Sequence, residues 1–100
     1  MKIPKRLKVG KRWYKVSVID KMEVMGTMGS TDYDTACIKV ATRSTINNKR
    51  FKDEDVNDTF WHELTHAILK DMGSKLETNE KFVCAFSSRL NNAILSARFK

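Results

Sequence analysis

The sequence predicts one α+β domain, in which a small N-terminal antiparallel sheet packs on a pair of helices. The chain has 100 residues, which is the usual length of a single domain. Apolar and polar residues alternate in two stretches of its first half, as in half-buried strands, and its second half carries apolar residues at helical spacing. We therefore expect a single domain over residues 1–100, with strands that cover one side of a two-helix pair.

The strands are expected at about residues 7–42. Segment 13–19 alternates, with Tyr14, Val16 and Val18 on one face, and segment 7–9 before it is expected to form the partner arm of a hairpin. Segment 36–42 alternates in the same way and is predicted to form a second strand. Glycines and polar residues interrupt segment 21–34, which predicts a short strand and a loop there.

Two helices follow, at about residues 54–72 and 77–97. Asp53 and Asp55 favour the N-terminal dipole of the first helix, and Gly73 marks its end. Because only a short connection separates the helices, we expect them to pack as an antiparallel pair. The apolar stripe of the second helix is predicted to consist of Val83, Phe86, Leu90, Ile94 and Ala97.

The formal net charge is +7, and the excess falls at the N-terminus. A basic arm of this kind can bind nucleic acid by neutralising phosphates. The sequence carries no helix-turn-helix spacing, zinc-finger pattern or RNA-binding signature to accompany it. We therefore favour solvated basic strands over a nucleic-acid interface. The basic residues are Lys2, Lys5, Arg6, Lys8, Lys11, Arg12 and Lys15.

The N-terminal segment also bears on the compartment. Residues 1–6 are basic without the apolar core of a secretion signal, and no apolar run approaches the roughly 18 residues of a membrane span. These features predict a cytoplasmic protein without a membrane partner. In that compartment Cys37 and Cys84 are expected as free thiols. We also expect a monomer.

The strongest chemical signal is His62-Glu63-Leu64-Thr65-His66, an HExxH pattern inside the first predicted helix. Side chains four apart on a helix stack one turn above the other, so both imidazoles can reach one metal ion. Glu63 is placed to act as general base on water that the metal activates. The alternative is an ordinary amphipathic helix. Against it, these are the only two histidines in the chain, and they lie off the apolar stripe.

A catalytic zinc site needs a third protein ligand, which here is a carboxylate or a cysteine because no third histidine exists. Asp71 ends the same helix and is poorly placed to turn back on the ion. On the second helix Glu80 lies at the edge of the apolar stripe, whereas Glu77 fits a capping role with Ser74. We favour Glu80, keep Glu77 in reserve, and rank Cys84 lower because a His, His, Cys site is closer in type to deaminases.

The segment from Asp58 to Leu69, with Asn79 to Val83 opening the next helix, resembles small gluzincin-type metallopeptidases. These are encoded by phages and mobile elements and are related to the ImmA/IrrE-type peptidases and the minigluzincins. The resemblance implies a zincin-like fold, a bacterial or phage origin and a Zn²⁺ cofactor. In that family a glutamate of the second helix completes the zinc site, and Glu80 is the matching position.

The resemblance extends upstream, to Gly29–Asp32 and to the strand around Lys39. In the family such a strand lies beside the active site, where a substrate backbone pairs with its edge. The resemblance therefore implies that Ile38, Lys39 and Val40 bind substrate by strand addition.

Together these features predict a zinc metallopeptidase that hydrolyses peptide bonds in a protein or peptide substrate, with Glu63 as general base. Tyr33 and Arg43 are the candidates for stabilising an oxyanion. The rival hypothesis is a non-enzymatic module that zinc stabilises, with a basic nucleic-acid-binding N-terminal region.

Overall fold

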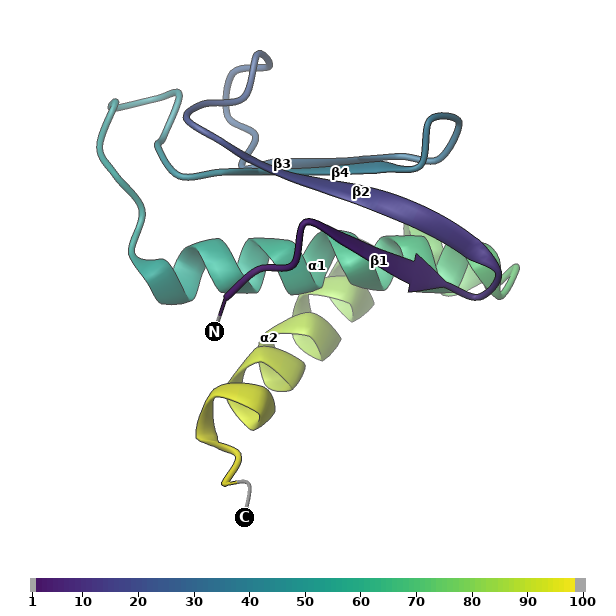
Figure 1. The fold of residues 1–100 in the computed structure, drawn as a ribbon. Coiled ribbons are helices and arrows are strands. Elements are labelled where there is room, and N and C mark those ends of the chain that lie inside the picture. Colours follow the sequence, from purple (N-terminus) through teal and green to yellow (C-terminus); the bar gives the residue numbers. More distant parts are fainter. Residues whose placement is uncertain (1, 99–100) are drawn as a thin grey trace.

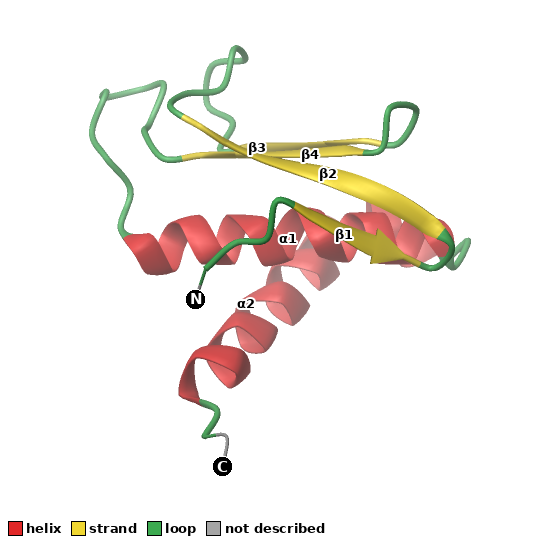
Figure 2. Ribbon diagram, viewed as in Figure 1, coloured by secondary structure: helices red, strands yellow, loops and turns green. Residues whose placement is uncertain are grey.

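The computed structural model describes residues 2–98 and shows a small α+β domain with one four-stranded sheet and two α-helices (Figures 1 and 2). The predicted fold class is confirmed at that level. The elements are β1 (Arg6–Val9), β2 (Arg12–Ile19), β3 (Gly29–Asp32), β4 (Cys37–Ala41), α1 (Asp53–Asp71), the short 3₁₀-helix η1 (Lys75–Thr78) and α2 (Glu80–Ser96).

The sheet is mixed, in the order β1-β2-β4-β3. Two antiparallel pairs, β1 with β2 and β3 with β4, meet at a parallel contact between β2 and β4. The expectation of a purely antiparallel sheet was wrong because β4 inserts between β2 and β3. β3 is antiparallel to β4, and β4 runs in the same direction as β2. Alternation of apolar residues reports which face a strand buries, but it does not report strand direction.

The apolar core lies between one face of the sheet and α1. Ile38 and Val40 of β4 have no exposed surface, and they form one buried cluster with Val16, Phe60 and Ala67. A half-buried sheet needs only one apolar layer against it, and α1 supplies that layer along the length of the strands (Figure 2). The core thus fixes α1, and the HExxH segment on it, against the strands.

The second helix packs on α1 and touches no strand within residues 2–98. The domain is therefore layered as sheet, α1 and α2, and the expected packing of the sheet on both helices was wrong. The chain reverses after α1, and α2 crosses it obliquely (Figure 1). The buried residues of α2 are Val83, Ser87 and Asn91.

The apolar stripe predicted for α2 is therefore wrong at Phe86 and Ile94, whereas Val83 is buried and Leu90 is half-buried. Phe86 is 48% exposed and Ile94 is 36% exposed, whereas the small polar Ser87 is 1% exposed. Residues four apart form one ridge on a helix, and the oblique crossing buries the ridge that starts at Val83.

Within the described residues, neither helix has the length and apolar character that a membrane span requires.

The junction between the helices differs from the predicted start of the second helix at residue 77. Residues 75–78 form η1, and Asn79 then caps α2 by accepting a hydrogen bond from the backbone N–H of Phe82 at 3.0 Å. As a result Glu80 is the first residue of α2, beside the two histidines, and Glu77 belongs to η1.

Candidate metal centre

The structure brings the three predicted ligands together. His62 and His66 lie one turn apart on α1, with ring centroids 4.9 Å apart. Glu80 faces both rings from the first turn of α2. Its Oε2 is 3.2 Å from His62 Nε2, and its Oε1 is 2.7 Å from His66 Nε2.

A hydrogen bond to the backbone fixes the tautomer of His66. Its Nδ1 lies 2.9 Å from the backbone carbonyl oxygen of Glu77, which can only accept a hydrogen bond. Nδ1 therefore carries the proton, and in a neutral ring Nε2 presents its lone pair toward Glu80. A lone pair facing a carboxylate is repulsive unless a cation, either a proton or a metal ion, lies between them.

Two of these separations can be compared with the spacing of ligands around a zinc ion. Two ligands at 2.0–2.1 Å from a tetrahedral ion stand about 3.3 Å apart. The separation between His62 Nε2 and Glu80 is close to that value, and the separation between His66 Nε2 and Glu80 is about half an ångström shorter. Two imidazoles and one carboxylate also match the donor set of catalytic zinc in hydrolases.

Cys84 lies on the other side of His62. Its Sγ is 3.8 Å from His62 Nδ1, and one ligand atom each from His62, Glu80 and Cys84 lie within 4.8 Å of one another. Among the described residues this is the one group of three possible ligand atoms that lie so close together, and His66 is outside it. Burial raises the pKa of the Cys84 thiol, as do the nearby carboxylates of Glu80 and Asp58.

The carboxylate of Glu63 does not face the histidines as that of Glu80 does, but lies against the sheet. Thr31 Oγ1 of β3 donates a hydrogen bond of 2.8 Å to Glu63 Oε1. Burial raises the pKa of the Glu63 carboxyl, whereas the Thr31 hydrogen bond and the charges of His62 and His66 oppose that shift. A buried carboxylate with a raised pKa is suited to accept a proton near neutral pH.

The close approach of β3 to α1 requires a glycine at position 29. A Cβ on Gly29 would lie 2.7 Å from Cγ2 of Thr59, 2.9 Å from the carbonyl oxygen of Lys39 and 3.2 Å from Cγ of Glu63. Real Cβ contacts below 3.0 Å essentially do not occur. Gly29 therefore permits the contact that holds Thr31 against Glu63.

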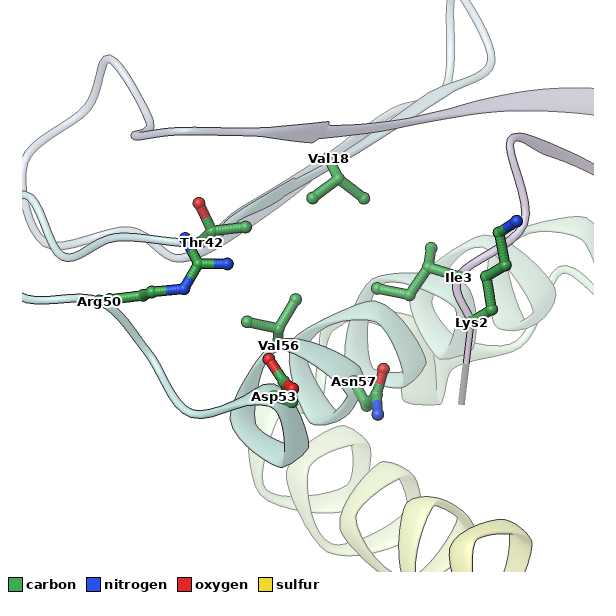
Figure 3. A pocket seen from close by; sticks show the side chains of 8 residues that line it. All are labelled: Lys2, Ile3, Val18, Thr42, Arg50, Asp53, Val56 and Asn57. Atoms are coloured by element: carbon green, nitrogen blue, oxygen red, sulfur yellow. The ribbon is translucent and has the colours of Figure 1, made fainter.

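The centre opens onto a cleft of about 400 Å³ between α1, α2 and the loop before β3. The lining residues are Gly26, Thr27, Met28, Gly29, Asp58, Thr59, His62, Glu63, Glu80 and Cys84. A second cleft, of about 360 Å³, lies where α1 begins, and its walls include Lys2, Val18 and Arg50 (Figure 3). Asp53 is the only acidic residue of that wall, and no histidine or cysteine lines it. The chemistry is therefore concentrated in the first cleft.

The predicted substrate-binding edge was misplaced. Ile38, Lys39 and Val40 lie in β4, which pairs with β2 on one side and with β3 on the other. Ile38 and Val40 are also fully buried. Both backbone edges of β4 are occupied, so it cannot accept a further strand. Within the described residues the edge strands are β1 and β3, and β3 is the one whose first residue, Gly29, lines the cleft.

The remaining candidates have other partners. Tyr33 donates its hydroxyl hydrogen to Oε1 of Glu77, and burial together with that carboxylate raises the pKa of Tyr33. Arg43 forms an ion pair of 3.0 Å with Asp20. Neither Tyr33 nor Arg43 lines the cleft, so the structure does not place either as an oxyanion stabiliser.

Glu77 does not have the predicted capping role. Its carboxylate accepts a hydrogen bond from Tyr33 and lies 4.0 Å from His66 Nδ1, on the side of the ring opposite Nε2. Ser74 caps η1 alone, by accepting from the backbone N–H of Leu76 at 3.2 Å.

Sequence reasoning missed two residues of the site, Asp58 and Thr31. Asp58 lines the cleft, has one buried carboxylate oxygen without a hydrogen-bond partner, and has a pKa that burial raises. Its position four residues before His62 was a readable signal, because Asp58, His62 and His66 share one face of the helix. Thr31 carries no such signal, since it is 32 positions from Glu63.

The chain matches no known protein family, and no curated protein or solved structure matches it significantly. Functional inference for this chain therefore depends on the residues of the centre.

Proposed function

We propose that the protein is a zinc-dependent peptidase in which His62, His66 and Glu80 hold the ion. The observation that carries this proposal is that two glutamates take different positions beside the histidines. Glu80 reaches Nε2 of both histidines, whereas Glu63, on the same helix as the histidines, is turned to Thr31 and the cleft. When bound in such a site, zinc acts as a Lewis acid that acidifies water and polarises a carbonyl.

The proposed role of Glu63 is to move protons. Thr31 engages Oε1, which leaves the second carboxylate oxygen to take a proton from the attacking water and deliver it to the leaving amine. Partial burial supports this role because it raises the pKa of the carboxyl from its ordinary value toward neutrality.

A peptide substrate is proposed to lie along β3. The outward edge of β3 is unpaired within residues 2–98, and Gly29 at its start lines the cleft next to Glu63. An extended peptide can add to such an edge through backbone hydrogen bonds, which places a peptide bond across the cleft.

The test combines metal analysis with a hydrolysis assay on unfolded casein, using protein purified without chelator. The native chain is expected to hold about one zinc, and Glu80→Gln to lose most of it. Glu63→Gln is expected to keep the zinc and lose about 100-fold or more in rate. Glu54→Gln, an exposed acid on α1, is the matched control and should change neither. Full activity in Glu63→Gln excludes the mechanism, and a native chain that takes up no zinc excludes the site.

A second candidate function is binding of single-stranded nucleic acid by the β1–β2 hairpin. Trp13 is 52% exposed there, with the Arg6 guanidinium 4.2 Å and the Lys8 ammonium 5.7 Å from its ring centroid. Aromatic rings among cations are the usual platform for stacked bases. This function predicts salt-sensitive binding of an oligonucleotide that Trp13→Ala weakens and Glu63→Gln leaves unchanged. Absence of salt-sensitive binding excludes it.

A further inference from the structure

Two pairs of ligand-type side chains face each other across the contact between α1 and α2. His62 and His66 are four residues apart on α1, and Glu80 and Cys84 are four residues apart on α2. Residues at this spacing lie on the same face of a helix. The helix contact therefore presents four groups that can ligate a metal, one more than an open zinc site uses.

Cys84 is close enough to join the centre. Its Sγ lies 3.8 Å from Nδ1 of His62, and one ligand atom each of Cys84, His62 and Glu80 lie within 4.8 Å of one another. A sulfur at 2.3 Å and an oxygen at about 2.0 Å from a tetrahedral zinc ion stand roughly 3.5 Å apart. Cys84 is exposed and has one side-chain torsion, so rotation about that bond can move its sulfur toward the ion.

We propose that Cys84 is the fourth zinc ligand of the resting protein, and that it lowers the activity of the peptidase by closing the open position of the site for most of the time. This builds on the zinc site proposed above. Binding converts the thiol to a thiolate, and its proton goes to solvent. A site with four protein ligands has no position left for water. Hydrolysis then requires the sulfur to leave the ion, which makes Cys84 the residue that controls activity.

A different role is available to the same side chain, and it has a different signature. Cys84 can instead hydrogen-bond to His62 Nδ1 and only orient the ring, as outer residues of metal sites do. A thiolate bound to cobalt(II) gives an intense near-ultraviolet charge-transfer band, whereas a sulfur outside the coordination sphere gives none.

The experiment uses the full chain loaded with cobalt(II) alone. We expect the charge-transfer band in the native chain and in Cys37→Ser, the matched control, because Cys37 lies in β4 and is outside the ligand cluster. Cys84→Ser should still bind cobalt, at least tenfold more weakly, without the band. With zinc, it should hydrolyse casein at least tenfold faster than the native chain.

A second measurement needs no variant. Zinc should slow alkylation of Cys84 by iodoacetamide at least tenfold and leave the alkylation rate of Cys37 unchanged, as read by mass spectrometry. Equal rates at Cys84 with and without zinc overturn the proposal.

The cobalt result separates this inference from the function on which it rests. Cobalt bound to the native chain without a charge-transfer band overturns the role of Cys84 and leaves the three-ligand site standing. A native chain that binds no cobalt and no zinc overturns both.

Discussion

Two residues behind the candidate centre, Glu77 and Tyr33, set the orientation of His66. The backbone carbonyl of Glu77 fixes the proton on Nδ1 of His66, and Tyr33 fixes the Glu77 side chain by donating to its carboxylate. Outer hydrogen bonds of this kind orient a ligand and set its tautomer, so they contribute to metal affinity without touching the ion. Tyr33 is therefore a positioning residue of the proposed site.

Removal of the Tyr33 hydroxyl should weaken zinc binding. Tyr33→Phe leaves the Glu77 carboxylate without its donor, and we expect zinc affinity to fall by about tenfold, the lower end of the range for outer partners. Competition with a chromogenic chelator measures this. Tyr14→Phe is the control, because Tyr14 is buried in the sheet core rather than beside His66. Equal affinities for Tyr33→Phe and the native chain would show that Glu77 needs no anchor.

The hydroxyl of Thr31 should hold down the pKa of Glu63. A donor stabilises the charged carboxylate and opposes the rise that burial causes, so Thr31→Val should raise the pKa of Glu63 further. Carboxyl ¹³C shifts followed against pH in the metal-free protein report this directly. Thr31→Ser keeps the hydroxyl and should titrate like the native chain. A pKa that is lower in Thr31→Val than in the native chain contradicts the assigned contact.

At the scale of elements, the centre depends on how closely β3 approaches α1. Gly29→Ala would place a methyl group against Thr59 and the carbonyl of Lys39, and we expect a loss of about 1–3 kcal/mol in the free energy of unfolding. Urea titration measures it. Because Thr59→Ala removes one of the two clashing atoms, the double variant should regain part of that loss. Ser30→Ala, on the same strand, adds no atoms and serves as control. Strict additivity of the two substitutions would argue against the contact.

Sequence reasoning reached the helix of the site more easily than the strands. Helical periodicity and the terminal signals at Asp53 and Gly73 predicted a first helix at 54–72, and α1 spans Asp53–Asp71. The turn-to-turn stacking of His62 and His66 follows from their spacing alone. Local patterns are sufficient here because a helix is built from contacts between near neighbours.

The predictions for the strands failed where the residues in contact are distant in sequence. Alternation around Lys39 predicted a strand correctly but carried no information on strand order, so it could not correct the edge position that the family resemblance implied. For the same reason the contact between Thr31 and Glu63 was invisible. The burial of Ser87 on α2 depends on the crossing of two helices, which apolar spacing within one helix does not encode.

At the scale of the whole molecule, the apolar core is confined to one side of α1. The buried cluster joins the sheet to α1, whereas the buried residues of α2 are Val83, Ser87 and Asn91, of which only Val83 is apolar. Burial of one valine contributes roughly 1.5–3 kcal/mol. The second helix therefore contributes little fully buried apolar surface, and an ion shared by His62 and Glu80 would add a link between the two helices.

Zinc removal should therefore loosen α2 before it affects the sheet. A ligand at 100 times its dissociation constant stabilises the native state by about 2.7 kcal/mol, which for a domain of this length raises Tm by about 10–20 °C. If the ion bridges the helices, the same free energy appears as about 100-fold slower amide hydrogen exchange along α2 at that zinc concentration. The sheet, held by its own core against α1, should gain less protection. Hydrogen exchange with and without chelator measures both regions in one experiment. Glu80→Gln, which lacks the bridging carboxylate, should show no zinc-dependent protection of α2. Protection by zinc that spreads evenly over sheet and helices would mean that the ion stabilises the fold as a unit, and that α2 is not a separately held element.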